Sequence, residues 1–167
     1  MKKYFSFAIA SLLMAAPMFL SSCGDDDDLF PDDVQDEVMT EWIEPYHEKN
    51  STLDDVKAYM ASSMKNHHLV KETHSAENVQ LAYSTSDINV GVLYSFSTVS
   101  GSLYSVIDTE LTINSPVVIN YLQKHYRLVS SNEASLQYCF TIQDKSMVIN
   151  TVKVSETCFN LNYSFVY

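Results

Sequence analysis

The sequence predicts an α+β fold in which two tandem repeats, each a helix plus a four-stranded antiparallel meander, form one sheet with both helices on one face. Three observations predict this fold. Two segments have the apolar spacing of amphipathic helices. Each is followed by four short strand-like segments that are separated by turn residues. The apolar stripes of the two helical segments also recur at a constant spacing along the chain, which indicates an internal repeat.

The first repeat is expected at about residues 52–111. Thr52 and Asp55 have the spacing of a capping box, with aspartate in place of the usual glutamate, and so predict a helix from about Leu53 to Met64. Gly101 can adopt a positive φ in the turn before the last strand. The four strands are predicted at 68–74, 78–85, 89–98 and 102–111.

The second repeat is expected at about residues 114–167. Ser115 is the predicted N-cap of its helix, and Pro116 would stand at the first helical position. Its stripe of Val118, Tyr121, Leu122 and Tyr126 matches Val56, Tyr59, Met60 and Met64 at an offset of 62 residues. The strands are predicted at 127–131, 135–142, 146–154 and 158–167. Two such units are expected to join into one sheet that carries both helices on the same face.

Residues 1–22 have the layout of a secretory signal peptide. Lys2 and Lys3 precede a mostly apolar stretch from Phe5 to Leu20, which is short for a membrane-spanning helix. The following "LSSC" resembles the lipobox of bacterial lipoproteins. That resemblance implies cleavage before Cys23 and acylation of the Cys23 thiol, so that the mature protein is anchored to a membrane by lipid.

An acidic tether and lead-in are predicted over residues 23–44, ahead of a domain at 45–167. The stretch "CGDDDD" resembles the export signal of surface lipoproteins of the Bacteroidota, carried here by Asp25, Asp26, Asp27 and Asp28. The resemblance implies display on the outer face of the outer membrane. A block of like charges also makes a solvated, self-repelling tether in either location, which leaves periplasm-facing anchoring as the alternative.

The end of the lead-in is expected to pack onto the domain. Val34, Val38 and Trp42 have helical spacing, so a short helix is compatible with this stretch, and Pro45 would end it. We expect Trp42 and Tyr46 to contact the domain through their aromatic rings.

The charge distribution separates the tether from the domain. The chain has 10 basic and 21 acidic residues, and loss of Lys2 and Lys3 with the signal peptide leaves 8 basic residues and a net charge of −13. Eleven of the acidic residues lie between Asp25 and Glu48. From Lys49 onward, 10 acidic residues face 8 basic ones, so the domain has no excess of positive charge for contacting phosphates. Binding to nucleic acid is therefore disfavoured.

Catalytic and metal-binding patterns are weak. Cys139 and Cys158 are expected to point to one side of the sheet with a strand between them, about 9–10 Å apart, and to remain free thiols. His67 and His68 are adjacent in the chain and would point to opposite faces of a strand, which does not favour a shared metal. We therefore expect no enzyme activity, no cofactor and no metal.

Alternation along the strands predicts an aromatic face against the helices and a neutral polar face opposite. Strand 146–154 does not divide cleanly, because Asn150 lies in register with Val148 and Val152. The polar side is the candidate binding face for a protein or a glycan, with Gln80, Ser84, Asn89, Gln137, Thr141, Asn160 and Asn162 as candidate residues. The predicted function is a lipid-anchored, non-catalytic binding module at the cell surface. The alternative is a periplasm-facing structural or assembly accessory.

This layout resembles the fold of the β-lactamase-inhibitor protein, a tandem repeat of a helix and a four-stranded antiparallel sheet. A short opening motif is also similar to that of small lipoproteins of the Bacteroidota, and it comprises Pro45, Tyr46, Asp55, Val56, Lys57, Tyr59 and Met60. The resemblance covers roughly residues 45–167. It implies the fold and a tendency towards protein binding.

Overall fold

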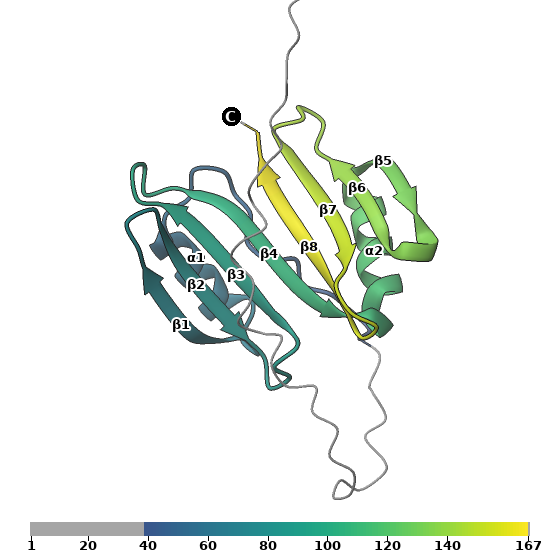
Figure 1. Ribbon diagram of the computed structural model, residues 1–167, viewed down its shortest axis with the longest axis horizontal. Coiled ribbons are helices and arrows are strands. Elements are labelled where there is room, and N and C mark those ends of the chain that lie inside the picture. The colour runs from purple at the N-terminus through teal and green to yellow at the C-terminus, as the bar shows by residue number, and fades with distance from the viewer. Residues whose placement is uncertain (1–38, 167) are drawn as a thin grey trace, which may run out of the picture. The chain divides into compact units, whose positions relative to one another are not determined.

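The computed structural model describes residues 39–166, which form an eight-stranded antiparallel sheet and two α-helices (Figure 1). The helices are α1 (Leu53–Ser62) and α2 (Ser115–His125). The strands are β1 (His68–His74), β2 (Asn78–Ser84), β3 (Gly91–Ser97), β4 (Leu103–Leu111), β5 (Arg127–Asn132), β6 (Gln137–Thr141), β7 (Met147–Lys153) and β8 (Cys158–Phe165). The expected α+β fold with an antiparallel sheet is confirmed.

The strand order is β1-β2-β3-β4-β8-β7-β6-β5, and every neighbouring pair is antiparallel. The strands β1–β4 form one meander and β5–β8 another. The two meanders meet at the β4–β8 ladder, whose register runs from Ser105 opposite Ser164 to Leu111 opposite Cys158. This ladder is the only neighbouring pair of the described sheet that is not consecutive in the chain.

Helix α1 begins as the sequence predicts. The Thr52 side chain accepts from the Asp55 backbone N–H, and the Asp55 carboxylate accepts from the Thr52 backbone N–H at 2.8 Å, which completes the capping box. The helix ends at Ser62, two residues before the predicted end. Met64 is nevertheless buried beyond the helix and belongs to the core.

The prediction of Ser115 as the N-cap of α2 is wrong. Asn114 holds the N-cap position, and Ser115 is the first helical residue. A short 3₁₀ turn, Thr112–Asn114, leads directly into the helix. The Asn114 side chain makes no capping bond, because its Oδ1 accepts instead from the backbone N–H of Met39 at 3.0 Å. A contact between residues so far apart in the chain leaves no local sequence pattern from which the N-cap could be predicted.

The core lies between the sheet and the helices, which both stand behind the strands in Figure 1. Strand β7, whose sequence does not divide cleanly into two faces, shows which of its side chains lie on each face. Met147, Ile149 and Thr151 are buried on the helix side, whereas Val148 and Val152 point the other way. The largest fully buried side chains are Tyr94, Tyr163, Phe96, Phe140, Phe159 and Met60.

Two strands, β3 and β6, begin two residues later than the sequence predicts because turns occupy the residues before them. In the segment before β3, Thr85 N–H donates to Val90 O and Val90 N–H donates to Asp87 O, so that the strand begins at Gly91. Before β6, Leu136 adopts φ +50°, a left-handed conformation that cannot continue a strand. Within residues 39–166, neither helix combines the length and the apolar composition that crossing a membrane requires.

Candidate functional site

The sheet face away from the helices, here called the open face, presents rows of side chains in register. One row runs across Gln80, Ser95, Ser105 and Ser164. The next runs across Ala82, Leu93, Ile107, Asn162 and Asn150. A third contains Gly91, Thr109 and Asn160. Neighbouring strands lie about 4.8 Å apart, so these side chains form one continuous surface.

Three of the predicted binding residues lie on the open face with partly exposed side chains. Gln80 donates from Nε2 to Ser95 Oγ at 3.3 Å. Thr109 donates from its hydroxyl to Asn160 Oδ1 at 3.0 Å. Asn162 stands opposite Asn150 on one side and Ile107 on the other. The amide groups therefore form a partly ordered, neutral hydrogen-bonding surface.

The other predicted binding residues lie nearer the strand ends. Ser84 and Thr141 are buried, and their hydroxyls donate to backbone carbonyls of the adjoining turns, including that of Met147 for Thr141. Asn89 is exposed but lies in the turn before β3. Gln137 is exposed and pairs with Asn132 of the edge strand β5. Cys23 and Asp25–Asp28 fall outside the described residues.

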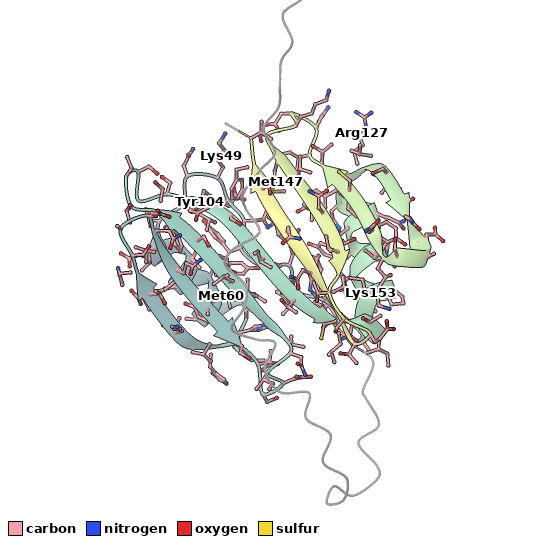
Figure 2. All side chains as sticks on the ribbon, in the orientation of Figure 1. Lys49, Met60, Tyr104, Arg127, Met147 and Lys153 are labelled. Carbon is pink, nitrogen blue, oxygen red and sulfur yellow. The ribbon has the colours of Figure 1, made fainter. Side chains whose placement is uncertain are left out.

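The chemistry of the open face changes between its middle and its edges. On the six inner strands its side chains are amides, hydroxyls, a thiol and aliphatic groups such as Leu93 and Ile107. Charged side chains stand on the edge strands, Lys71 on β1 and Arg127 on β5, and Figure 2 labels the latter at its edge. Protein surfaces usually intersperse charges of both signs, whereas the cores of interfaces are depleted of charge.

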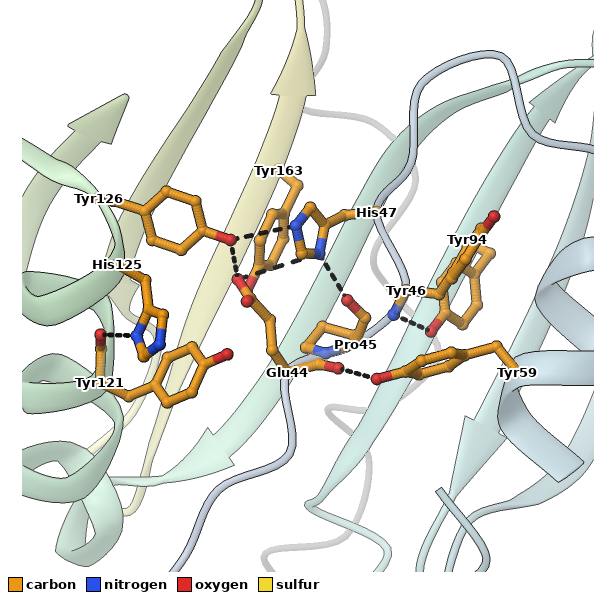
Figure 3. Close-up of polar contacts among 10 residues, drawn as sticks. All are labelled: Glu44, Pro45, Tyr46, His47, Tyr59, Tyr94, Tyr121, His125, Tyr126 and Tyr163. Atoms are coloured by element: carbon orange, nitrogen blue, oxygen red, sulfur yellow. Dashed lines mark hydrogen bonds and ion pairs between the residues drawn. The ribbon is translucent and has the colours of Figure 1, made fainter. Parts of the chain in front are cut away.

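A second constellation lies on the helix side of the sheet. Residues 39–48, here called the strap, run without regular secondary structure between the two helices (Figure 3). The expected short helix over 34–42 is absent from residues 39–42, the part that the structure describes. The expected packing of Trp42 and Tyr46 onto the domain is confirmed: Trp42 is 4% exposed, and the Tyr46 ring lies 5.2 Å from that of Tyr59.

Trp42 anchors the first half of the strap. Its ring meets Tyr121 of α2 edge-on at 5.1 Å between centroids, a favourable aromatic geometry. Its indole N–H donates to Glu110 Oε1 at 3.1 Å. The side chain thus joins the strap both to a helix and to the central strand β4.

Tyrosine hydroxyls hold the second half of the strap around Glu44 (Figure 3). Tyr126 and Tyr163 donate to Glu44 Oε1 at 2.7 and 3.1 Å. Tyr59 of α1 donates to the Glu44 carbonyl at 2.8 Å. Burial raises the pKa of Tyr163 well above its ordinary value, and the nearby Glu44 carboxylate adds to the rise. These hydroxyls therefore remain protonated donors at neutral pH.

His47 completes this cluster. Its Nδ1 lies 2.7 Å from the Pro45 carbonyl, which can only accept, so Nδ1 carries a proton. Its Nε2 lies 3.1 Å from the Tyr126 hydroxyl. Its Nδ1 also lies 3.9 Å from Glu44 Oε1.

Two carboxyl groups of β4, Asp108 and Glu110, point into the covered side beneath the strap and are here called the acid pair. Asp108 is 0% exposed, and its cross-strand neighbours are the apolar Val92 and Leu161. No group meets hydrogen-bond geometry with either Asp108 carboxyl oxygen or with Glu110 Oε2. The Trp42 indole and the Thr109 backbone N–H are close enough to oppose the rise in the pKa of Asp108, but their effect is smaller than that of burial. Burying an ionised carboxylate without hydrogen-bond partners is strongly unfavourable.

Burial accordingly raises the pKa of both groups. The pKa of Asp108 lies well above its ordinary value because of desolvation and then the neighbouring Glu110. Desolvation raises the pKa of Glu110 to about 7, against the opposing effect of the Trp42 indole N–H. The carboxyl groups of the acid pair are therefore harder to ionise than exposed carboxyl groups.

Sequence reasoning missed the acid pair and Glu44. In the segment that forms β4, Val106, Asp108 and Glu110 alternate with Ile107 and Thr109, so hydrophobicity alone does not identify the covered side. The irregular register near Ser95 and Leu103 obscures it further. The sequence contained one signal for the acid pair, namely Trp42, because a buried indole N–H needs a hydrogen-bond acceptor.

Neither constellation contains an activated nucleophile. Cys139 and Cys158 are free, as expected. In the described part of the chain, no three His, Cys, Asp or Glu side chains are grouped so that they could hold a metal ion. Comparisons with models of protein families, with curated proteins and with solved structures find no match to this chain.

Proposed function

We propose that this protein is a lipid-anchored, non-catalytic binding module displayed on the outer membrane, and that its open face contacts a protein or glycan ligand. The observation that carries the proposal is the composition of this face: neutral amides and hydroxyls around Leu93 and Ile107, with charged groups confined to the edges. Such a face can be desolvated at little electrostatic cost, while its amides provide directional hydrogen bonds.

The proposed location rests on sequence. Cys23 would carry the acyl chains, and Asp25, Asp26, Asp27 and Asp28 would direct surface display. Acyl chains bury about 0.8 kcal/mol per methylene, so several of them anchor a protein firmly. Digesting intact cells with an external protease tests the location. Cleavage of the wild-type protein, and protection of a variant with the four aspartates changed to alanine, is the expected result.

The binding site is tested by photo-crosslinking in cells that produce the full chain. A photoreactive phenylalanine analogue replaces Asn162 on the open face or, as a matched control, Gln123 on the exposed side of α2. We expect a discrete adduct from position 162 only. Its loss after glycosidase treatment would identify a glycan, and peptides of a second protein in the digested adduct would identify a protein.

Other outcomes contradict the proposal. An adduct from position 123 alone would place the contact on the helix side. If neither position gives an adduct in cells where the protein is surface-exposed, the result would favour a structural accessory. Changing Gln80, Gln137 and Asn160 to lysine in the protein that carries the photoreactive group at position 162 provides a second readout, because added charge would abolish an adduct formed at the open face.

We also propose that the two halves derive from one duplicated unit similar to that of the β-lactamase-inhibitor protein. Each half has a helix followed by four strands. Each edge strand has an irregular register at the same place in its sequence, between Leu69 and Lys71 in β1 and between Leu128 and Ser130 in β5. Val70 and Val129, the residues at these irregularities, are both exposed. A solved homologue with a single unit would test the duplication.

A further inference from the structure

The strap is the cover that separates the acid pair from water at the middle of the sheet. Asp108 and Glu110 lie two residues apart on one side of β4, so their carboxyl groups share one environment. Glu44 of the strap brings a third carboxyl group towards them and raises the pKa of Asp108. The strap, which carries Glu44, therefore covers a strand that carries two further carboxyl groups.

The groups around the acid pair provide little compensation for negative charge. From the strap, Trp42 donates one hydrogen bond to Glu110, and Glu44 adds a negative charge. Tyr94 of β3 and Tyr163 of β8 are close enough to Asp108 for its charge to raise their pKa values. From α1 and α2, Tyr59 and Tyr121 contribute neutral hydroxyls near Glu44. His47 is the nearby base, and it faces Glu44.

The strap is attached in a different way from the helices and strands. It has no ladder of backbone hydrogen bonds: Trp42 donates to Glu110, the Glu44 carboxylate accepts from Tyr126, and the Tyr46 backbone N–H donates to the Tyr94 hydroxyl. Displacing it would give water access to the acid pair without breaking the sheet. Regions held by few such contacts are the ones that open locally while the rest of a domain stays folded.

We propose that the strap is a proton-dependent cover: it stays docked between α1 and α2 while the acid pair holds its proton, and it detaches when that proton is lost. Deprotonation leaves two carboxylates beneath Glu44 without enough donors. Release of the strap hydrates all three groups and removes their mutual repulsion. It also uncovers the aromatic surface formed by Tyr94, Tyr121 and Tyr163. This inference stands independently of the function proposed for the open face.

The experiment uses the single tryptophan of the chain, which lies in the strap. Acrylamide quenching of Trp42 fluorescence in the full-length protein reports its access to solvent, and far-UV circular dichroism reports the sheet. As the pH is raised from 5 to 9, we expect quenching to increase several-fold through a transition near neutrality, with the circular dichroism unchanged. The Asp108→Asn/Glu110→Gln double variant should keep Trp42 shielded throughout.

The control is Glu77→Gln, which removes an exposed carboxylate of the same kind and should retain the transition. Constant quenching in the wild-type protein would overturn the proposal, as would a transition that persists in the double variant. Loss of the circular dichroism over the same range would also overturn it, because the whole domain would then be opening. Should the double variant not fold, hydrogen exchange of the wild-type protein decides, with protection relative to the intrinsic exchange rate lost at high pH by the strap amides only as the expected result.

Discussion

The two faces of strand β4 invert the usual distribution of charge. On the covered face, where apolar residues are expected, β4 carries Asp108 and Glu110. On the open face it carries Ser105, Ile107 and Thr109. Since burying a carboxylate is unfavourable and exposing one is not, this arrangement cannot be explained by stability alone. The difference agrees with the two proposals made above, docking of the strap on the covered face of β4 and contact with a ligand on its open face.

The largest expected effect on stability comes from removing Trp42, which anchors the strap to the covered face. Trp42→Ala should lower the free energy of unfolding by about 3–5 kcal/mol, because it leaves a cavity beside Tyr121 and removes the donor to Glu110. Urea denaturation measures the change. Ile43→Ala is the control, since Ile43 is 48% exposed and its truncation should change stability by less than about 0.5 kcal/mol. Equal losses in the two variants would refute the anchoring role of Trp42.

The pH dependence of stability should be the next largest effect. Glu110 has a pKa of about 7 when folded against 4.5 ordinarily, so the folded state holds a proton that the unfolded state releases between these values. The free energy of unfolding should therefore fall as the pH rises from about 4.5 to above 7, by about 3 kcal/mol from this group. Urea titrations at several pH values measure the slope.

Glu110→Gln should flatten that pH dependence. Below about pH 4 the free energy of unfolding should instead fall as the pH is lowered. Hydrogen bonds with Thr52 and Lys57 hold the pKa values of Asp55 and Glu72 below their ordinary values, so protonating these carboxylates favours the unfolded state. An increase in stability between pH 5 and 8 would contradict the burial of an uncharged Glu110.

Adjacent residues of β7 offer a matched pair across the two faces. On the covered face, Thr151 donates to the Leu136 carbonyl at 2.6 Å and accepts from the Tyr138 N–H at 2.9 Å. Thr151→Val should lower the free energy of unfolding by about 1–3 kcal/mol, because both backbone groups lose their partner. Val152→Thr, at a side chain 39% exposed on the open face, should change it by less than about 0.5 kcal/mol. Thermal unfolding of both variants makes the comparison.

The smallest expected effect on stability is on the open face itself. Asn162→Lys should change the free energy of unfolding by about 0.5 kcal/mol or less, because the ammonium group can extend into water. The same substitution should abolish an open-face adduct formed through a photoreactive group at Asn160. A large loss of stability would indicate that the open face is structural, and an unaffected adduct would exclude Asn162 from the contact.

The parts of the fold that follow from local chemistry could be predicted from the sequence. The capping box at Thr52 and Asp55 marked the start of α1, and alternation placed Tyr94, Phe140 and Phe159 in the core. The predicted open face includes Gln80, Asn160 and Asn162 because amides alternate regularly with aromatic residues there.

The strap and the acid pair could not be predicted in the same way. Asp108 breaks the rule that a covered strand face is apolar, and its environment depends on Glu44 and Trp42, more than sixty residues earlier in the chain. The N-cap of α2 was predicted at Ser115 and not at Asn114 for the same reason, because the Asn114 side chain bonds to distant Met39 and does not cap the helix. Contacts of this length have no periodic pattern in the sequence.

The β4–β8 ladder has a consequence for how the chain folds. Each of the other strand pairs joins neighbours in the sequence, so those pairs can close over short loops. Thr109 and Asn160, bonded across the β4–β8 ladder, are 51 residues apart. The entropy of closing this one long loop should make the joining of the two meanders the slow step of folding.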